Sequence, residues 1–152
     1  MKRVLFICTA NVCRSPMAES LFNALAEDRG LGVRAESAGV AALKGKPMAP
    51  NASAALEEIG VYAEGHSARQ VNAKMLEEAD LVLTMSPWHV AELRRAFGGF
   101  FGARTLPEYV SGAPNEEEIS DPYGSAMVAY RASLRQLFGY MDLLMERLVE
   151  GG

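Results

Sequence analysis

Cysteine, histidine and tryptophan are scarce in this chain, whose 152 residues include 2 Cys, 2 His and 1 Trp. The two cysteines, Cys8 and Cys13, lie in one short segment and therefore provide no disulfide framework. They are also too few for a structural zinc site. In a reducing compartment we expect both to be thiols, although their closeness would allow a reversible Cys8–Cys13 disulfide that protects or silences a nucleophile.

The chain also lacks any apolar stretch that approaches the length of a membrane span, and its N-terminus lacks the apolar core of a signal peptide. The formal net charge of -4 gives no reason to expect nucleic acid or a membrane surface as a partner. Hydrophobic residues make up 49% and charged residues 22%, which is ordinary for a soluble globular protein. Because no repeat or linker divides the chain, we expect a single domain over residues 1–152. The lack of a membrane span and of a signal-peptide core leads us to expect a cytoplasmic location.

Apolar runs alternate with segments of helical periodicity along the chain. The expected strands are Lys2–Ile7, Val33–Ala38, Leu81–Met85 and Ala103–Leu106. The expected helices are Ser15–Asp28, Asn51–Ile59, Asn72–Ala79, Ser86–Phe97 and Ser125–Glu150, with an irregular stretch over Pro107–Tyr123. This alternation predicts an α/β fold, a doubly wound parallel sheet with helices on both faces. Ligands of such sheets bind beyond the carboxyl ends of the strands, and the first expected strand ends beside Cys8.

The segment from Cys8 to Ser15 carries the strongest functional signal. It follows an apolar strand and leads into a helix, for which Ser15 suits the N-cap and Pro16 the first helical position. The tight turn lets backbone N–H groups converge on an anion, which also meets the helix dipole and Arg14. The same field would hold a cysteine as thiolate. A buried structural Cys8 is the plainer interpretation, but Arg14, Ser15 and the helix start together favour a phosphate-binding nucleophile.

These residue types predict a covalent mechanism. Cys8 would attack phosphorus in line and form a phosphocysteine, while Arg14 grips two non-bridging oxygens. The hydroxyl of Ser15 can donate to the Cys8 sulfur and make it a better leaving group in the second step. Asp121, whose backbone is restricted by the proline that follows it, would protonate the leaving group and later deprotonate the attacking water. Tyr123 would wall the entrance and pack against the substrate side chain.

Three motifs resemble, in the right order, those of the low-molecular-weight protein tyrosine phosphatase family. They are Cys8–Ser15 with Pro16 and Ala18-Glu19, then Ser37-Ala38-Gly39, and finally Asp121-Pro122-Tyr123. The similarity covers essentially the whole chain. It implies a three-layer fold with a four-stranded parallel sheet flanked by helices, and catalysis without a metal or other cofactor. It also implies a cysteine-dependent phosphatase that acts on phosphorylated proteins or peptides and binds phosphate or another oxyanion in the Cys8–Ser15 loop.

The resemblance implies a role for each residue of the site. The catalytic set comprises the nucleophile Cys8, the phosphate ligand Arg14, the thiolate-stabilising Ser15 and the acid Asp121. The residues expected to contact the substrate are Thr9, Ala10, Asn11, Val12, Cys13 and Tyr123. Asn11 shapes the loop that binds phosphate, and Ser37 and His66 match positions that hold this asparagine.

Two positions depart from the family's pattern. Ala10 stands where the family usually has glycine, and because alanine tolerates a positive φ poorly, this peptide is expected to sit differently. Val12 stands where tyrosine phosphatases carry isoleucine and where a bacterial branch that dephosphorylates arginine carries threonine. Valine has the shape of threonine and the polarity of isoleucine, so it favours neither substrate. Phosphotyrosine is the broader prediction, and phosphoarginine is a nearly equal alternative by the same mechanism.

Two other functions fit the sequence less well. Arsenate reductases that share this loop need further cysteines to relay a disulfide outward, and the chain has none after Cys13. A phosphoprotein-binding module needs neither a nucleophile nor an acid, whereas this chain has candidates for both in Cys8 and Asp121.

Overall fold

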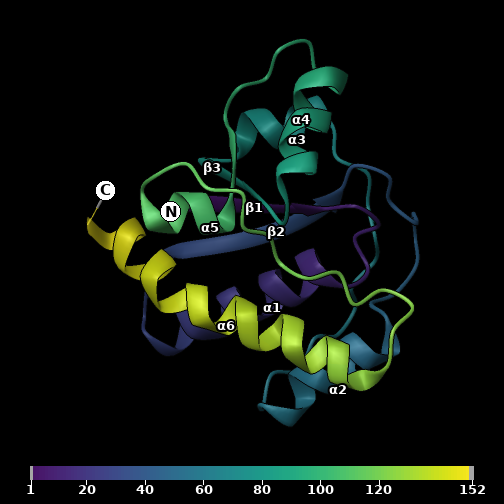
Figure 1. Ribbon diagram of the computed structural model, residues 1–152. Helices are drawn as coiled ribbons and strands as arrows, with labels where there is room; N and C mark the ends of the chain where they lie inside the picture. Colours follow the sequence, from purple (N-terminus) through teal and green to yellow (C-terminus); the bar gives the residue numbers. More distant parts are fainter. Residues whose placement is uncertain (1, 151–152) are drawn as a thin grey trace.

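The computed structural model describes residues 2–150, which form a four-stranded parallel sheet between two layers of helices (Figure 1). The strands are β1 (Lys2–Cys8), β2 (Val33–Gly39), β3 (Leu81–Thr84) and β4 (Ala103–Thr105), in the sheet order β2-β1-β3-β4. In this order β2 lies beside one edge of β1, whereas β3 and then β4 lie beside the other edge. In sheets of this kind the reversal places the ligand crevice at the carboxyl end of the central strand. The predicted fold class is confirmed.

Helices cover both faces of this sheet. They are α1 (Arg14–Asp28), α2 (Pro50–Glu58), α3 (Ala73–Glu78), α4 (Pro87–Ala96), α5 (Leu106–Ser111) and α6 (Met127–Glu150). In Figure 1, α1 and α6 cover one face with α2 beside them, and α3 and α4 cover the other. The short α5 packs against β4 and α6. Within residues 2–150, none of the helices has both the length and the hydropathy that crossing a membrane requires.

The central strand β1 is buried on both faces because its side chains alternate between the two helical layers. Phe6 belongs to the core on the α1 and α6 side, whereas Leu5 and Ile7 belong to the core on the α3 and α4 side. The fully buried ring of Phe6 packs edge-on against Phe22 of α1, with the ring centroids 5.8 Å apart. Packing from both sides fixes the position of Cys8 at the end of the strand.

The start of α1 differs from the prediction. The helix begins at Arg14 with Cys13 as its N-cap residue, so Ser15 is not the N-cap. The prediction was wrong because the Ser15 hydroxyl lies 2.8 Å from the Cys8 sulfur instead of capping a backbone N–H. Pro16 is consequently the third helical residue, where its missing N–H still costs no helical hydrogen bond.

The stretch predicted to be irregular after β4 contains α5. Its N-cap is Thr105, whose Oγ1 accepts a hydrogen bond of 3.1 Å from the backbone N–H of Glu108. The helix ends before Gly112, which has a left-handed φ of 76°. The prediction missed this helix because the Thr-x-x-Glu pattern of a capping box overlaps the end of the expected strand.

The last helix, α6, begins at Met127 rather than at Ser125. The backbone N–H of Ser125 instead closes a turn on the carbonyl of Pro122, at 2.8 Å. This turn belongs to the loop that carries Asp121, so the candidate acid is followed at once by a closed turn and a long packed helix.

Candidate active site

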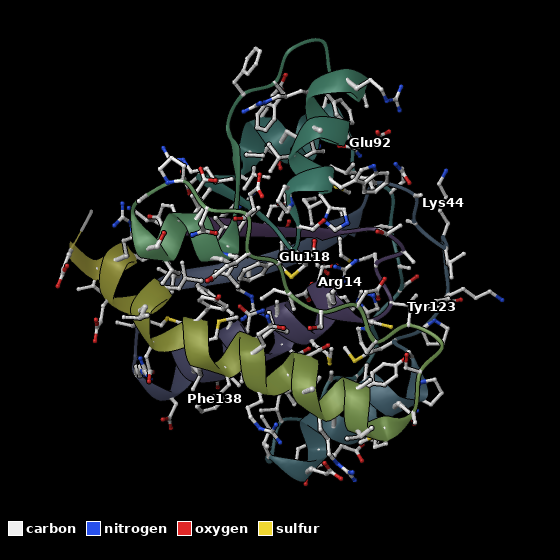
Figure 2. All side chains as sticks on the ribbon, viewed as in Figure 1. Arg14, Lys44, Glu92, Glu118, Tyr123 and Phe138 are labelled. Atoms are coloured by element: carbon white, nitrogen blue, oxygen red, sulfur yellow. The ribbon has the colours of Figure 1, made fainter. Side chains whose placement is uncertain are left out.

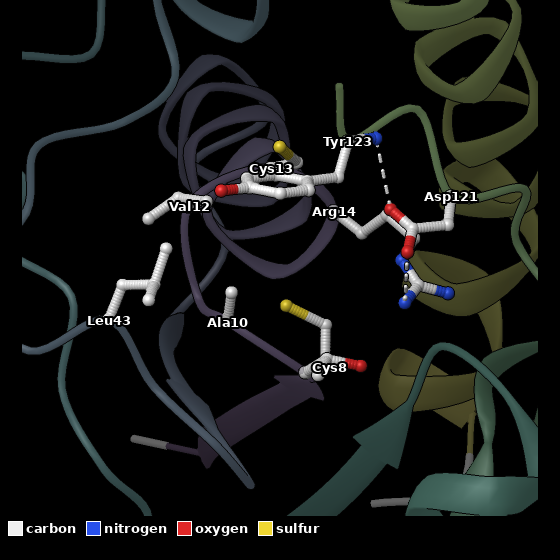
Figure 3. Close-up of a pocket in the computed structure, with 9 residues that line it drawn as sticks. Cys8, Ala10, Val12, Cys13, Arg14, Leu43, Asp121 and Tyr123 are labelled. Atoms are coloured by element: carbon white, nitrogen blue, oxygen red, sulfur yellow. Dashed lines mark hydrogen bonds and ion pairs between the residues drawn. The ribbon is translucent and has the colours of Figure 1, made fainter. Parts of the chain in front are cut away.

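A pocket of about 190 Å³ lies at the carboxyl end of β1 (Figure 3). Its walls are formed by Cys8, Thr9, Ala10, Val12, Cys13, Arg14, Leu43, Asp121 and Tyr123. The fold thus brings the predicted acid to the predicted nucleophile from the other end of the chain. Arg14 is buried whereas Tyr123 is exposed, so the pocket leads from the surface to the interior (both residues are labelled in Figure 2).

The Cys8–Ser15 loop turns its carbonyl groups outward. The carbonyl oxygens of residues 8–13 accept hydrogen bonds of 2.8–3.0 Å from the N–H groups of Val40, Ala41, Leu43, Ala49 and Met17 and from the ring of His66. In a trans peptide the N–H points away from the preceding carbonyl, so the N–H groups of residues 9–13 face the pocket. Within the part of the chain that the structure describes, they donate to no protein group. Such converging donors form a site for an oxyanion.

The backbone strain of this loop falls on Asn11. Among the described residues other than glycine, it alone has a positive φ, of 61°, which asparagine tolerates better than most residues. The backbone N–H of Arg69 donates to its Oδ1 at 3.0 Å, and the Nε2 of His66 lies 2.8 Å from its carbonyl oxygen. Ala10 has no positive φ, so the alanine at this position carries no backbone strain of that kind.

A chain of hydrogen bonds fixes the direction of the proton between Ser15 and Cys8. A carboxylate only accepts, so the Ser37 hydroxyl donates to Glu19 at 2.7 Å. The Nδ2 of Asn11 donates to the oxygens of Ser37 at 3.0 Å and of Ser15 at 2.8 Å. Because the Asn11 amide is oriented by the N–H on its Oδ1, the Ser15 oxygen is an acceptor there. The Ser15 proton is therefore free to be donated to the Cys8 sulfur, 2.8 Å away.

Arg14 is held at one side of the pocket by groups from the late part of the chain. Its Nη1 donates to the carbonyl of Ile119 at 3.1 Å, and its Nη2 lies 3.5 Å from Oδ2 of Asp121. The other carboxylate oxygen of Asp121 accepts from the backbone N–H of Tyr123 at 3.1 Å (Figure 3). Arg14 is only 6% exposed, so its charge acts inside the pocket with little screening by solvent.

Cys13 lies beside the same pocket but in a different environment. Burial raises the pKa of its thiol to about 11, although the Tyr130 hydroxyl, 3.6 Å from the sulfur, partly opposes this. At neutral pH Cys13 is therefore a protonated thiol, unsuited to be the nucleophile. Both cysteines are buried and free.

Sequence reasoning missed three contributors to the pocket: Leu43, the carbonyl of Ile119, and His89. Leu43 lines the entrance and is an apolar residue in a loop otherwise rich in small and charged ones. A backbone carbonyl such as that of Ile119 leaves no signal in a sequence. His89 was detectable as the third residue of the helix that starts after Ser86. Within residues 2–150, no three His, Cys, Asp or Glu side chains gather as a metal site.

The chain matches the model of the family described as low molecular weight phosphotyrosine protein phosphatase over residues 3–151. A protein-arginine-phosphatase of Bacillus subtilis (strain 168) is 36% identical to it over 146 residues, 95% of each chain. A low molecular weight protein tyrosine phosphatase from T. tengcongensis has a structure with a TM-score of 0.91 and 37% identity, covering 97% of this chain and 99% of that one. A cysteine-to-serine variant of the YwlE arginine phosphatase, with a phosphorylated active-site serine, gives a TM-score of 0.90 and 35% identity, covering 96% and 95%.

The neighbouring thiols predict reversible oxidation. Peroxide should convert the Cys8 thiolate to a sulfenic acid, from which the Cys13 thiol displaces water to form a disulfide. We expect mild hydrogen peroxide to abolish phosphatase activity and dithiothreitol to restore it. Replacing Cys13 by Ala removes the resolving thiol and should make the loss harder to reverse, as measured by activity recovered after reduction. Equal recovery in both proteins would show that Cys13 has no protective role.

Proposed function

This chain belongs to the low molecular weight phosphotyrosine protein phosphatase family, and we propose that it hydrolyses phosphotyrosine in proteins or peptides and accepts phosphoarginine as a second substrate. The observation that carries the proposal is the set of inward-facing N–H groups of residues 9–13 around Cys8, with Arg14 and Asp121 at the rim. We further propose that residues 1–152 act as one phosphatase domain. Its place would be the cytoplasm, where the nucleophilic thiol stays reduced.

In the first step the phosphoryl group binds to the N–H groups of the Cys8–Ser15 loop and to the guanidinium of Arg14. The Cys8 sulfur attacks phosphorus, and the bond from phosphorus to the leaving oxygen or nitrogen breaks with its electron pair on the leaving group. Asp121 gives that group a proton. The donors of the loop and Arg14 stabilise the charge that develops on the phosphoryl oxygens in the transition state.

In the second step water attacks the phosphocysteine while Asp121 takes its proton. The bond between sulfur and phosphorus breaks, and its electron pair returns to Cys8, where the Ser15 hydroxyl donates to the sulfur. Inorganic phosphate then leaves. The phosphorylated serine of the YwlE variant supports a covalent intermediate at the corresponding position of a similar fold.

The walls above the phosphate site support the choice of substrates. Val12, Leu43 and Tyr123 offer apolar surface for a flat aromatic ring (Figure 3). Tyr123 is 58% exposed, so a substrate that stacks on it would still be reached from solvent. Phosphoarginine is favoured as the second substrate by the similarity to a protein-arginine-phosphatase over nearly the whole chain and by the polar wall residue Thr9.

Replacing Cys8 by Ser tests the covalent mechanism. We expect steady-state turnover to fall to background, because a serine hydroxyl is a much weaker nucleophile and its oxygen a poorer leaving group than sulfur. The variant should still bind inorganic phosphate, and any slow attack should leave one stable phosphoserine, visible as added phosphate mass on the intact protein. Cys8→Ala, the matched control, should bind phosphate and gain no mass. Substantial turnover by either variant would remove Cys8 from the mechanism.

Replacing Asp121 by Asn tests the general acid. We expect the rate on phosphotyrosine or phosphoarginine peptides to fall roughly a hundred- to ten-thousand-fold, the usual contribution of such catalysis. An aryl phosphate with a very acidic leaving group needs no proton, so its first step should slow much less. The measurement compares kcat/KM on both kinds of substrate for the two proteins. Equal losses in kcat/KM would assign Asp121 to the structure of the site instead of to general acid catalysis.

Substitutions at Val12 test the choice between the two substrates. We expect Val12→Thr to favour phosphoarginine by giving the guanidinium a polar neighbour, and Val12→Ile to favour phosphotyrosine by adding apolar surface. A change of this size in a pocket shifts discrimination by roughly 10- to 200-fold. The measurement is the ratio of kcat/KM for the two phosphopeptides across the three proteins. A constant ratio would make Val12 a packing residue only.

A further inference from the structure

A buried histidine that the mechanism above does not use is hydrogen-bonded to Thr9, a residue that lines the pocket. His89, in the first turn of α4, is 1% exposed. Its Nε2 lies 2.9 Å from Oγ1 of Thr9, the residue that directly follows the nucleophile. The indole of Trp88 packs edge-on against the imidazole, with ring centroids 5.4 Å apart, and helps to fix its orientation. The contact joins the start of α4 to the Cys8–Ser15 loop.

The hydrogen-bond partners of His89 determine where its proton lies. The backbone N–H of Ser86 is 3.1 Å from Nδ1, and a backbone N–H can only donate, so Nδ1 carries no proton. Nε2 therefore carries it and donates to the Thr9 hydroxyl. Burial, with the positive charge of Arg14, lowers the pKa of His89 to about 4, although the charge of Asp121 acts in the opposite direction. The ring thus keeps one tautomer throughout the neutral pH range.

This donation changes what Thr9 can offer to a substrate. A threonine hydroxyl has one proton and two acceptor positions. His89 occupies one acceptor position, which leaves the hydroxyl one acceptor position and its proton, on a residue that lines the pocket. The other walls above the phosphate site are mainly apolar, formed by Val12, Leu43 and the ring of Tyr123.

The two proposed substrates differ in how they would meet this hydroxyl. The guanidinium of phosphoarginine has N–H groups close to phosphorus that can donate to Thr9. The ring of phosphotyrosine has only C–H groups at the same distance, so it would cover the hydroxyl without replacing its hydrogen bond to water. Covering a polar group in this way costs binding free energy.

We propose that His89 is a positioning residue that holds the Thr9 hydroxyl as an acceptor for the guanidinium of phosphoarginine, and that this pair raises the preference for phosphoarginine over phosphotyrosine. The inference rests on the proposed function and names the residues that set its second substrate. Thr9 makes the contact with the substrate, and His89 acts through Thr9.

The test measures kcat/KM for a phosphoarginine and a phosphotyrosine peptide in the unmodified protein and in variants. Thr9→Val removes the hydroxyl and keeps the shape of the side chain, and Thr9→Ser is the control that keeps the hydroxyl. We expect Thr9→Val to lower the ratio of phosphoarginine to phosphotyrosine kcat/KM by roughly 10- to 100-fold, the effect of losing one hydrogen bond to a charged group. Thr9→Ser should change it much less, and inhibition by inorganic phosphate should stay the same in both variants.

His89→Leu should lower the same ratio in the protein that has Thr9 and leave it unchanged in the protein that has Thr9→Val. A merely structural role for His89 would slow both substrates equally in both backgrounds, and that result would overturn the inference. If His89→Leu does not fold, the comparison of Thr9→Val with Thr9→Ser decides, and equal ratios in the two would also overturn the inference.

An unmodified protein that cleaves neither peptide contradicts the proposed function itself. One that cleaves only phosphotyrosine contradicts this inference and the second substrate of the proposed function, but leaves the hydrolysis of phosphotyrosine in place.

Discussion

The outward hydrogen bonding of the carbonyl groups of residues 8–13 is the constraint on which the rest of the site depends. It turns the N–H groups of the same peptides toward one point, where they have no protein partner among residues 2–150. A buried N–H without a partner costs about 1–3 kcal/mol. The loop after β2 supplies most of the partners that hold the carbonyls. Its approach is so close that a Cβ on Gly39 would lie 2.4 Å from the carbonyl oxygen of Thr9. An anion in the pocket would accept hydrogen bonds from these N–H groups and so remove this cost, which is why the arrangement favours anion binding.

The second requirement is that the hydrogen bonds behind the loop run in one direction. A chain made only of hydroxyl groups can reverse, and the proton of Ser15 would then point away from Cys8. The amide of Asn11 prevents this, because the backbone N–H of Arg69 on its Oδ1 turns its Nδ2, which only donates, toward Ser15 and Ser37. The carboxylate of Glu19 completes the arrangement by accepting the proton of Ser37, so that the Ser37 oxygen is also an acceptor for Asn11.

The sequence allowed the sheet, its helices and the main residues of the site to be predicted, because each left a local pattern. Apolar runs marked the strands, and Cys8, Arg14 and Ser15 stand together in one segment. The features that were missed depend on contacts between distant segments. The hydroxyl of Ser15 could either cap the helix or donate to the Cys8 sulfur, and only the position of Cys8 at the packed end of β1 decides between these roles. The contact of His89 with Thr9 requires α4 to start beside β1, which follows from strand order and not from either residue.

In the proposed mechanism, phosphate and the rest of the substrate are recognised by different parts of this fold. The phosphoryl group, which every phosphorylated side chain shares, would contact the backbone N–H groups of the loop and Arg14. The leaving group would contact side chains that line the pocket: Thr9, hydrogen-bonded to His89 of α4, Leu43 from the loop after β2, and Tyr123 from the loop before α6. Because these walls are side chains whereas the loop is held by hydrogen bonds to its backbone carbonyls, a wall can change without removing those hydrogen bonds. The proposed mechanism would therefore serve an oxygen or a nitrogen leaving group with the same phosphate site, and the side chains at the rim of the pocket would decide between them.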